Sequence, residues 1–227
     1  MTPLPSLAVD LCGVRLPTPV LAASGCFGFG REMAGFVDLA GIGAVVTKSV
    51  SLEPRRGRPT PRVTETPSGM LNAIGLQNPG VEAFCASDLP FLAEAGARVV
   101  ASVVGRTADE FGRVTARLAG EPAVRLIEVN LSCPNVEHRG EVFAIDPEAA
   151  AAVIRAVKVH AHQPVLAKLT ADVTDLVAVA RAVVDAGADG LTLINTLLGM
   201  AVDTKRRRPP GRWRTPRRGA RRWGRRG

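Results

Sequence analysis

The sequence predicts an α/β fold, an incomplete (β/α)8 TIM barrel of about six strand–helix units. Short apolar runs alternate with segments of helical periodicity, and polar residues follow nearly every apolar run. A barrel assembles its site from the carboxyl ends of its strands, so this distribution favours a barrel. A doubly wound open sheet is the alternative, although the Gly-rich stretch 23–30 lacks the spacing of a dinucleotide-binding turn.

Six runs rich in Val, Ile, Leu and Ala are the predicted strands. They are Pro19–Ala23, Gly43–Ser49, Arg98–Val104, Arg125–Leu131, Pro164–Leu169 and Gly190–Asn195. Continuous apolar runs are typical of parallel strands that are buried on both faces. Upstream of them, Leu7–Leu16 turns at Cys12-Gly13 and predicts a hairpin that closes the bottom of the barrel. A complete barrel has eight strands, so we expect this one to be open.

Five segments between the strands have helical periodicity, namely 30–40, 80–96, 107–119, 147–161 and 173–187. Asp146 and Pro147 are the residue types of an N-cap and a first helical position. Gly187 is the residue type that ends a helix before the next strand.

The formal net charge of +8 arises in the last 23 residues. Positions 205–227 hold 12 Lys/Arg and no acid, whereas residues 1–204 hold 17 basic and 21 acidic side chains, a net of −4. We expect this tail to be disordered, because it has almost no aliphatic residue to bury. Three interpretations of the tail are open: a nucleic-acid-binding arm, a solvated basic tail, and out-of-frame translation of a GC-rich gene. The Arg, Gly, Pro and Trp content of the tail favours the third.

Composition narrows the class of protein. The longest apolar runs fall short of the roughly 20 residues of a membrane helix, and Met1–Pro5 does not resemble a secretory signal. We therefore predict a cytoplasmic protein without a membrane segment. The four cysteines have no C-x-x-C spacing, which argues against a metal site and predicts free thiols.

Four motifs together resemble those of dihydroorotate dehydrogenases. Thr66–Gly80 (TPSGMLNAIGLQNPG) resembles the substrate loop of that family, and Glu128–Asn135 (EVNLSCPN) is similar to its catalytic segment. Val46–Val50 and Leu193–Thr196 complete a resemblance that extends from about residue 7 to 209 and is greatest to the class 1B catalytic subunit. The resemblance implies an FMN-dependent oxidoreductase that converts dihydroorotate to orotate in pyrimidine biosynthesis, with NAD as the final acceptor.

The resemblance also implies the roles of individual residues. FMN would contact Ser24, Lys48, Ser49, Ser102, Asn130, Lys168 and Ile194. The substrate would contact Lys48, Asn72, Ala73, Ile74, Gly75, Leu76, Asn130, Asn195 and Thr196. Cys133 would be the base that removes a carbon-bound proton while hydride leaves the neighbouring carbon for the flavin. A lone Cys after a strand more often packs in a core, but the motif around Cys133 favours the base. Cys12, Cys26 and Cys85 are interpreted as structural.

Partners follow from the same resemblance. It implies a homodimer of catalytic subunits joined to an electron-transfer subunit that carries FAD and a 2Fe-2S cluster, which makes a heterotetramer. Ser102 stands where the family commonly has Asn, so one flavin contact is in doubt. After Pro209 the sequence no longer matches the family. The family continues there with a Gly-Gly-Leu-Ser-Gly segment and two more strand–helix units, which cradle the FMN phosphate.

This departure divides the predicted chain into an incomplete flavin and substrate domain, 1–204, and the basic tail, 205–227. We expect poor FMN binding and a tendency to aggregate. Two alternatives stay open. One is a non-catalytic remnant whose tail binds nucleic acid, and the other is a flavin domain of the dihydropyrimidine dehydrogenase type.

Overall fold

The computed structural model describes residues 6–132, 142–202 and 204–205. The chain forms two compact units. The first comprises positions 1–56 and 76–197, and the second comprises positions 57–75 and 198–227. Almost all of the regular secondary structure belongs to the first unit.

A six-stranded parallel sheet organises the first unit. Its strands are β3 (Leu21–Ala22), β4 (Ala44–Val46), β7 (Val99–Val103), β8 (Val124–Asn130), β9 (Val165–Lys168) and β10 (Gly190–Thr192). They lie in the order β10-β9-β8-β7-β4-β3, and each neighbouring pair is parallel. The order never reverses along the chain, whereas a doubly wound sheet contains a switch point. The sheet is therefore the open part of a barrel, and all six predicted strands are confirmed.

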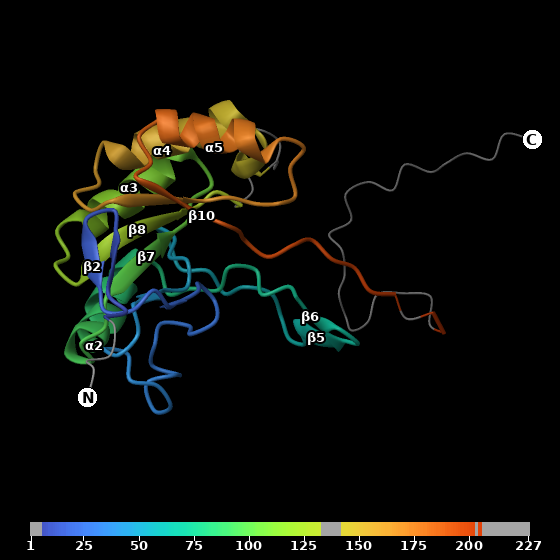
Figure 1. Cartoon of the computed structure of the whole chain (residues 1–227). Helices are drawn as coiled ribbons and strands as arrows, with labels where there is room; N and C mark the ends of the chain where they lie inside the picture. Colours follow the sequence, from blue (N-terminus) through green and yellow to red (C-terminus); the bar gives the residue numbers. More distant parts are fainter. Residues whose placement is uncertain (1–5, 133–141, 203, 206–227) are drawn as a thin grey trace, which may run out of the picture. The chain divides into compact units, whose positions relative to one another are not determined.

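Helices cover one face of this sheet. Helices α3 (Ala108–Ala119), α4 (Pro147–Lys158) and α5 (Leu176–Asp185) pack side by side over the strands, as Figure 1 shows. The predicted helix 80–96 consists of α1 (Val81–Ala83), the π-helical η1 (Phe84–Asp88) and α2 (Leu89–Glu94). A short 3-10 helix, η2 (Phe143–Ile145), precedes α4.

The predicted helix 30–40 is wrong. This segment forms separate turns, closed by bonds such as the one from the Ala34 N–H to the Gly30 carbonyl. Gly30 has a φ of 90°, and Gly35 lies in the middle of the segment, so the segment has a low helix propensity at both positions.

The helix signals that we predicted at 146, 147 and 187 are confirmed. The Asp146 carboxylate accepts hydrogen bonds from the N–H groups of Glu148 (2.9 Å) and Ala149 (3.2 Å), and Pro147 follows it at the start of α4. Gly187 has a φ of 103°, a value that glycine adopts more readily than other residues. It follows Ala186, the C-cap residue of α5.

The other face of the sheet changes from apolar to polar along its strands. At the amino end, a hairpin of β1 (Val9–Leu11) and β2 (Val14–Leu16) packs its side chains on those of the strands. The buried cluster there contains Val14, Leu16, Ala44, Val46, Val100, Leu126 and Leu166. Side chains alternate along a strand, so Glu128 and Asn130 follow Leu126 on this inner face, and Lys168 follows Leu166. The hairpin thus closes the apolar bottom, as predicted, and the polar residues lie at the opposite end.

The second unit contains an antiparallel hairpin of β5 (Val63–Thr66) and β6 (Gly69–Asn72), with Val63 opposite Asn72. Two further backbone bonds extend the pairing, from the Ala73 N–H to the Arg62 carbonyl (2.8 Å) and from the Arg58 N–H to the Ile74 carbonyl (2.9 Å). The strand pairing therefore continues past Asn72 into the segment Ala73–Gly75.

Two predictions concern segments at the limits of the described structure. Among the described residues, no helix is long and apolar enough to cross a membrane. The prediction of disorder for 205–227 falls almost entirely on positions outside the described residues.

Candidate functional site at the carboxyl ends of the strands

Hydrogen bonds join four polar side chains into a polar chain at the carboxyl end of the sheet, two of them on β7 and β8 and two in the segments after β4 and β10. The Ser49 and Ser102 hydroxyls lie 3.0 Å apart, and the Asn130 amide donates to the Ser49 hydroxyl at 3.0 Å. The Asn130 carbonyl oxygen accepts from the Asn195 amide at 3.1 Å. Ser49, Ser102 and Asn130 are buried, so the two bonds among them are shielded from competing water, whereas the bond to Asn195 is part-buried. The structure thus brings together four residues that the sequence assigned to one site.

Lys168 lies on the same inner face, at the end of β9. Its side chain is 8% exposed, and its ammonium lies 3.5 Å from a carboxylate oxygen of Glu128 on the neighbouring strand β8. In the register of the sheet, Asn130 is the residue that pairs with Lys168, which places the cation beside the polar chain. A buried ammonium next to amide groups is suited to binding an anion or a group that becomes negative.

Lys48 and Ser24 occupy the loops after β4 and β3. The Lys48 N–H donates to the Gly28 carbonyl at 2.9 Å, which holds the two loops together. A side chain at Gly25 would come within 3.7 Å of the Lys48 ammonium, so the first loop runs directly past this cation. Ser24, the residue before Gly25, is half-buried in that loop.

The segment after β10 carries Asn195 and two more of the predicted site residues, Ile194 and Thr196. The Asn195 N–H donates to the Leu169 carbonyl at 2.9 Å, which fixes this segment against the end of β9. The Asn195 side chain also accepts from the Thr196 N–H at 2.8 Å. Ile194 is 37% exposed, so one side of it is open to a ligand.

The predicted substrate loop is divided between the two units. Leu76 belongs to the first unit, whereas Asn72, Ala73, Ile74 and Gly75 belong to the second. Within the first unit, the buried side chain of Asn78 organises the chain around Leu76. It accepts from the N–H groups of Ser51 (3.1 Å) and Gly80 (2.9 Å) and donates to the Leu76 carbonyl (2.8 Å). The predicted base, Cys133, lies outside the described residues.

Sequence reasoning missed Glu128 as a site residue. Its side chain is 2% exposed and faces the inner layer with Lys168. The sequence contained a signal for Glu128, because a carboxylate inside a largely apolar strand is unusual. Glu128 is also two residues from both Leu126 and Asn130, so alternation along the strand places the three side chains on the same face. Thr47 was also missed, and its hydroxyl accepts the Ser102 N–H at 3.2 Å.

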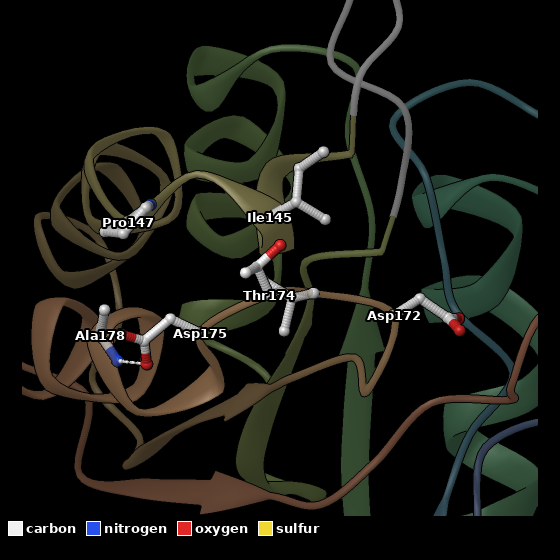
Figure 2. A pocket seen from close by; sticks show the side chains of 7 residues that line it. Ile145, Pro147, Asp172, Thr174, Asp175 and Ala178 are labelled. Carbon is white, nitrogen blue, oxygen red and sulfur yellow. Dashed lines mark hydrogen bonds between the residues drawn. The ribbon is translucent and has the colours of Figure 1, made fainter.

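A cavity of about 320 Å³ lies elsewhere, between the beginnings of α4 and α5 (Figure 2). Ile145, Pro147 and Thr174 are among its lining residues. One of its two carboxylates, that of Asp175, already accepts the Ala178 N–H at 2.9 Å, which Figure 2 shows as a dashed line. None of the predicted site residues lines this cavity, so it is separate from the polar chain.

Comparison with known proteins identifies the family. The family model described as dihydroorotate dehydrogenase matches residues 6–214. The chain belongs to the dihydroorotate dehydrogenase family. This is the family that the four sequence motifs indicated, so the predicted resemblance is confirmed. The predicted oxidoreductase class and the predicted place in pyrimidine biosynthesis are confirmed with it.

Two bacterial relatives carry the name dihydroorotate dehydrogenase B (NAD(+)), catalytic subunit. The protein of Geobacter sp. (strain M21) is 51% identical over 205 residues, which are 90% of this chain and 67% of the relative. That of Listeria monocytogenes serovar 1/2a is 53% identical over 203 residues, 89% of this chain and 67% of the relative. These names agree with the predicted resemblance to the class 1B catalytic subunit.

A solved structure supports the fold. The dihydroorotate dehydrogenase of Eimeria tenella, crystallised with ferulenol, aligns with a TM-score of 0.71 at 18% identity, over 87% of this chain and 61% of that one. This likeness confirms the barrel class. The chain spans less than two thirds of the length of that protein.

Dihydroorotate dehydrogenase family membership implies FMN as the cofactor, and the described residues fit it. A flavin ring has a polar edge of carbonyl and N–H groups, and the inner face offers two amides, two hydroxyls and a buried ammonium. The Ser132 hydroxyl is buried and has no partner among the described residues, so one more polar atom here can bond a ligand.

Proposed function

We propose that this chain provides the FMN and dihydroorotate site of an NAD-linked dihydroorotate dehydrogenase. The observation that carries the proposal is the polar chain from Ser102 to Asn195, together with Lys168, at the carboxyl ends of the strands. Ser24, Lys48, Ser49, Ser102, Asn130, Lys168 and Ile194 contact FMN. Lys48, Asn72, Ala73, Ile74, Gly75, Leu76, Asn130, Asn195 and Thr196 contact the substrate.

The residues divide the chemistry among them. FMN, when bound, supplies the acceptor for the hydride that leaves dihydroorotate. Cys133 removes the proton from the adjacent carbon, so that a carbon–carbon double bond forms and orotate results. Lys48 binds the substrate carboxylate by charge, and Asn130 and Asn195 fix the orientation of the ring. Lys168 holds a positive charge where negative charge accumulates on reduction.

The names of the relatives imply a partner. A catalytic subunit that acts with NAD requires a route for electrons out of the site. We propose that a separate subunit with FAD and a 2Fe-2S cluster takes them, in a heterotetramer built on a homodimer of this chain. Its place would be the cytoplasm, where NAD and pyrimidine precursors are available.

Flavin binding is the first test of the proposal. The full chain is titrated with FMN while flavin fluorescence is recorded, and dihydroorotate is then added without oxygen. Because the sequence after Pro209 does not match the segment that would cradle the FMN phosphate, we expect weak but saturable binding, and bleaching of the visible flavin absorbance on reduction. Lys168→Met tests the site, because it removes the buried charge with little change in volume. Flavin that binds equally well to Lys168→Met, or does not bind the full chain, contradicts the proposal.

Substrate choice is the second test. Dihydrouracil has no carboxylate, so a site that uses Lys48 for charge recognition should reduce its flavin with dihydroorotate alone. Reduction by dihydrouracil instead would favour the dihydropyrimidine dehydrogenase alternative. Binding of a nucleic acid that is sensitive to salt and lost on deletion of 205–227 would favour the non-catalytic alternative.

A further inference from the structure

The inner face contains a charged pair, Glu128 and Lys168, of which the proposed chemistry uses only the lysine. Glu128 is 2% and Lys168 8% exposed at the side chain, and their nearest atoms are 3.5 Å apart. The two residues come from neighbouring strands, β8 and β9, and lie within the hydrogen-bonded sheet. Because both backbones are fixed by the ladder, the carboxylate has little freedom to move away from the ammonium.

The apolar surroundings of the pair increase the effect of the carboxylate on the ammonium. Below the pair, the inner face is apolar and contains Leu126 and Leu166. An ammonium buried beside apolar side chains tends to lose its proton, because burial disfavours the charged form. An opposite charge within a few ångströms has the reverse effect and favours the charged form.

Other groups around Lys168 do not replace Glu128. Strand β10, which pairs with Lys168 through Thr192, has no titratable residue in Gly190–Thr192. Lys48, in the loop after β4, has the same sign of charge as Lys168 and therefore cannot act as its counter-charge. Asp172 is an exposed acid in the loop after β9, and its N–H and carboxylate both bond the Thr170 hydroxyl.

We propose that Glu128 is a positioning residue, whose carboxylate keeps the Lys168 ammonium charged and fixed on the inner face of the sheet. The inference rests on the proposed function in one respect, namely that Lys168 acts at the flavin. Without Glu128, the ammonium would be a buried cation without its counter-charge, and it would give up its proton at a lower pH than in the unaltered chain.

The pair can be tested without any flavin. The chain has four lysines, Lys48, Lys158, Lys168 and Lys205, so a full chain with 13C-labelled lysine gives few side-chain signals. The Lys168 signal is assigned by its loss in Lys168→Met, and its pKa is read from the shift of the labelled carbon with pH. We expect Glu128→Gln to lower the pKa of Lys168 by more than about one unit.

Two variants serve as controls. Glu148→Gln removes an exposed carboxylate paired with Arg155 on α4, and it should leave the pKa of Lys168 unchanged. Glu128→Asp keeps the charge but withdraws it by one methylene, so it should give a smaller fall than Glu128→Gln. An unchanged pKa of Lys168 in Glu128→Gln overturns the proposal.

A folding failure of Glu128→Gln is also informative. If the unpaired ammonium is the cause, then Glu128→Gln combined with Lys168→Met removes both charges and should fold. A double variant that also fails to fold shows that Glu128 is needed for another reason, and this overturns the proposal.

A flavin readout separates this inference from the proposed function. Sulfite adds to flavin with gain of negative charge, so its affinity reports a nearby cation. In FMN-loaded Glu128→Gln, the loss of sulfite affinity with rising pH should begin at lower pH than in the unaltered chain. A lowered pKa of Lys168 without any change in sulfite affinity would support the pair and contradict the place of Lys168 at the flavin.

Discussion

The side-chain amide of Asn195 donates to the side-chain carbonyl of Asn130 at 3.1 Å, across 65 residues of sequence. Asn130 ends β8, and Asn195 lies in the segment after β10, two strands away in the sheet. One amide, that of Asn130, therefore links this segment to Ser49 in the loop after β4. The arrangement at the carboxyl end of the sheet depends on Asn130 more than on any neighbour in the polar chain.

Asn130→Ala should destabilise the fold by about 1–3 kcal/mol, because Ser49 and Asn195 each lose a partner in a buried or half-buried place. Urea unfolding followed by circular dichroism measures this loss. Asn130→Asp should cost less, since its carboxylate accepts from both Asn195 and the Ser49 hydroxyl. Equal stability of Asn130→Ala and the unaltered chain would show that the chain of bonds has no energetic role.

Asp146→Ala should lower the free energy of unfolding by about 1 kcal/mol, because the N–H groups of Glu148 and Ala149 lose their acceptor. Asp185→Ala, at the end of α5, is the matched control and should have almost no effect, since an acid there caps no N–H group. The same urea experiment compares the two. A loss in Asp185→Ala as large as in Asp146→Ala would contradict the capping role.

The fold was largely predictable from the sequence, and the failures have a physical reason. Apolar runs such as Arg98–Val104 locate buried parallel strands, because such strands are commonly covered on both faces and are rich in Val, Ile and Leu. The helix prediction for 30–40 failed because apolar spacing suggested a helix, while the glycines at 30 and 35 favour turns. Apolar spacing indicates which side chains are buried, whereas glycine residues determine whether the backbone stays helical.

Stability should decrease in acid through Asp189. Burial works against its ionisation, but hydrogen bonds from the Lys158 ammonium (2.8 Å) and the Val165 N–H (2.7 Å) prevail and hold the pKa of Asp189 below its usual range. A lowered pKa in the folded state stabilises the fold above about pH 4 and ceases to do so as the pH falls through the folded value. Asp189→Asn should therefore flatten the dependence of the melting temperature on pH below about 4. An unchanged slope would contradict this assignment.

The cysteines should differ in reactivity. Burial, the largest cause, raises the pKa of Cys85 to about 11, with Arg117 acting against the shift and Glu121 adding to it. Cys26 is exposed in the loop after β3. At pH 8, iodoacetamide should therefore modify Cys26 well before Cys85, because the thiolate is the reactive form. Mass spectrometry of timed digests measures both rates, and faster modification of Cys85 would contradict its buried, protonated state.

The candidate site was predictable in its residues but not in its internal bonds. Motifs name Ser49, Asn130 and Lys168, yet they do not say that Asn130 bonds Ser49 or that Glu128 faces Lys168. Such contacts depend on the order and register of the strands, because only the pairing of Asn130 with Lys168 sets Glu128 beside the ammonium. Ser102 illustrates the same point. The doubtful substitution there has a partner, the Ser49 hydroxyl, that the sequence alone could not reveal.

The last prediction concerns the edge of the sheet at β10, which pairs on one side only within the described residues. Apolar side chains are exposed on this strand and on the helix before it, namely Leu191 on β10 and, at 58% and 49% exposure, Val177 and Val184 on α5. An unpaired strand edge beside an apolar surface favours association between copies. Val177→Lys with Val184→Lys should reduce light scattering at equal concentration while the far-ultraviolet circular dichroism stays the same. Val179→Lys, on the buried side of α5, should unfold the chain instead, and unchanged scattering in the double variant would show that association occurs elsewhere.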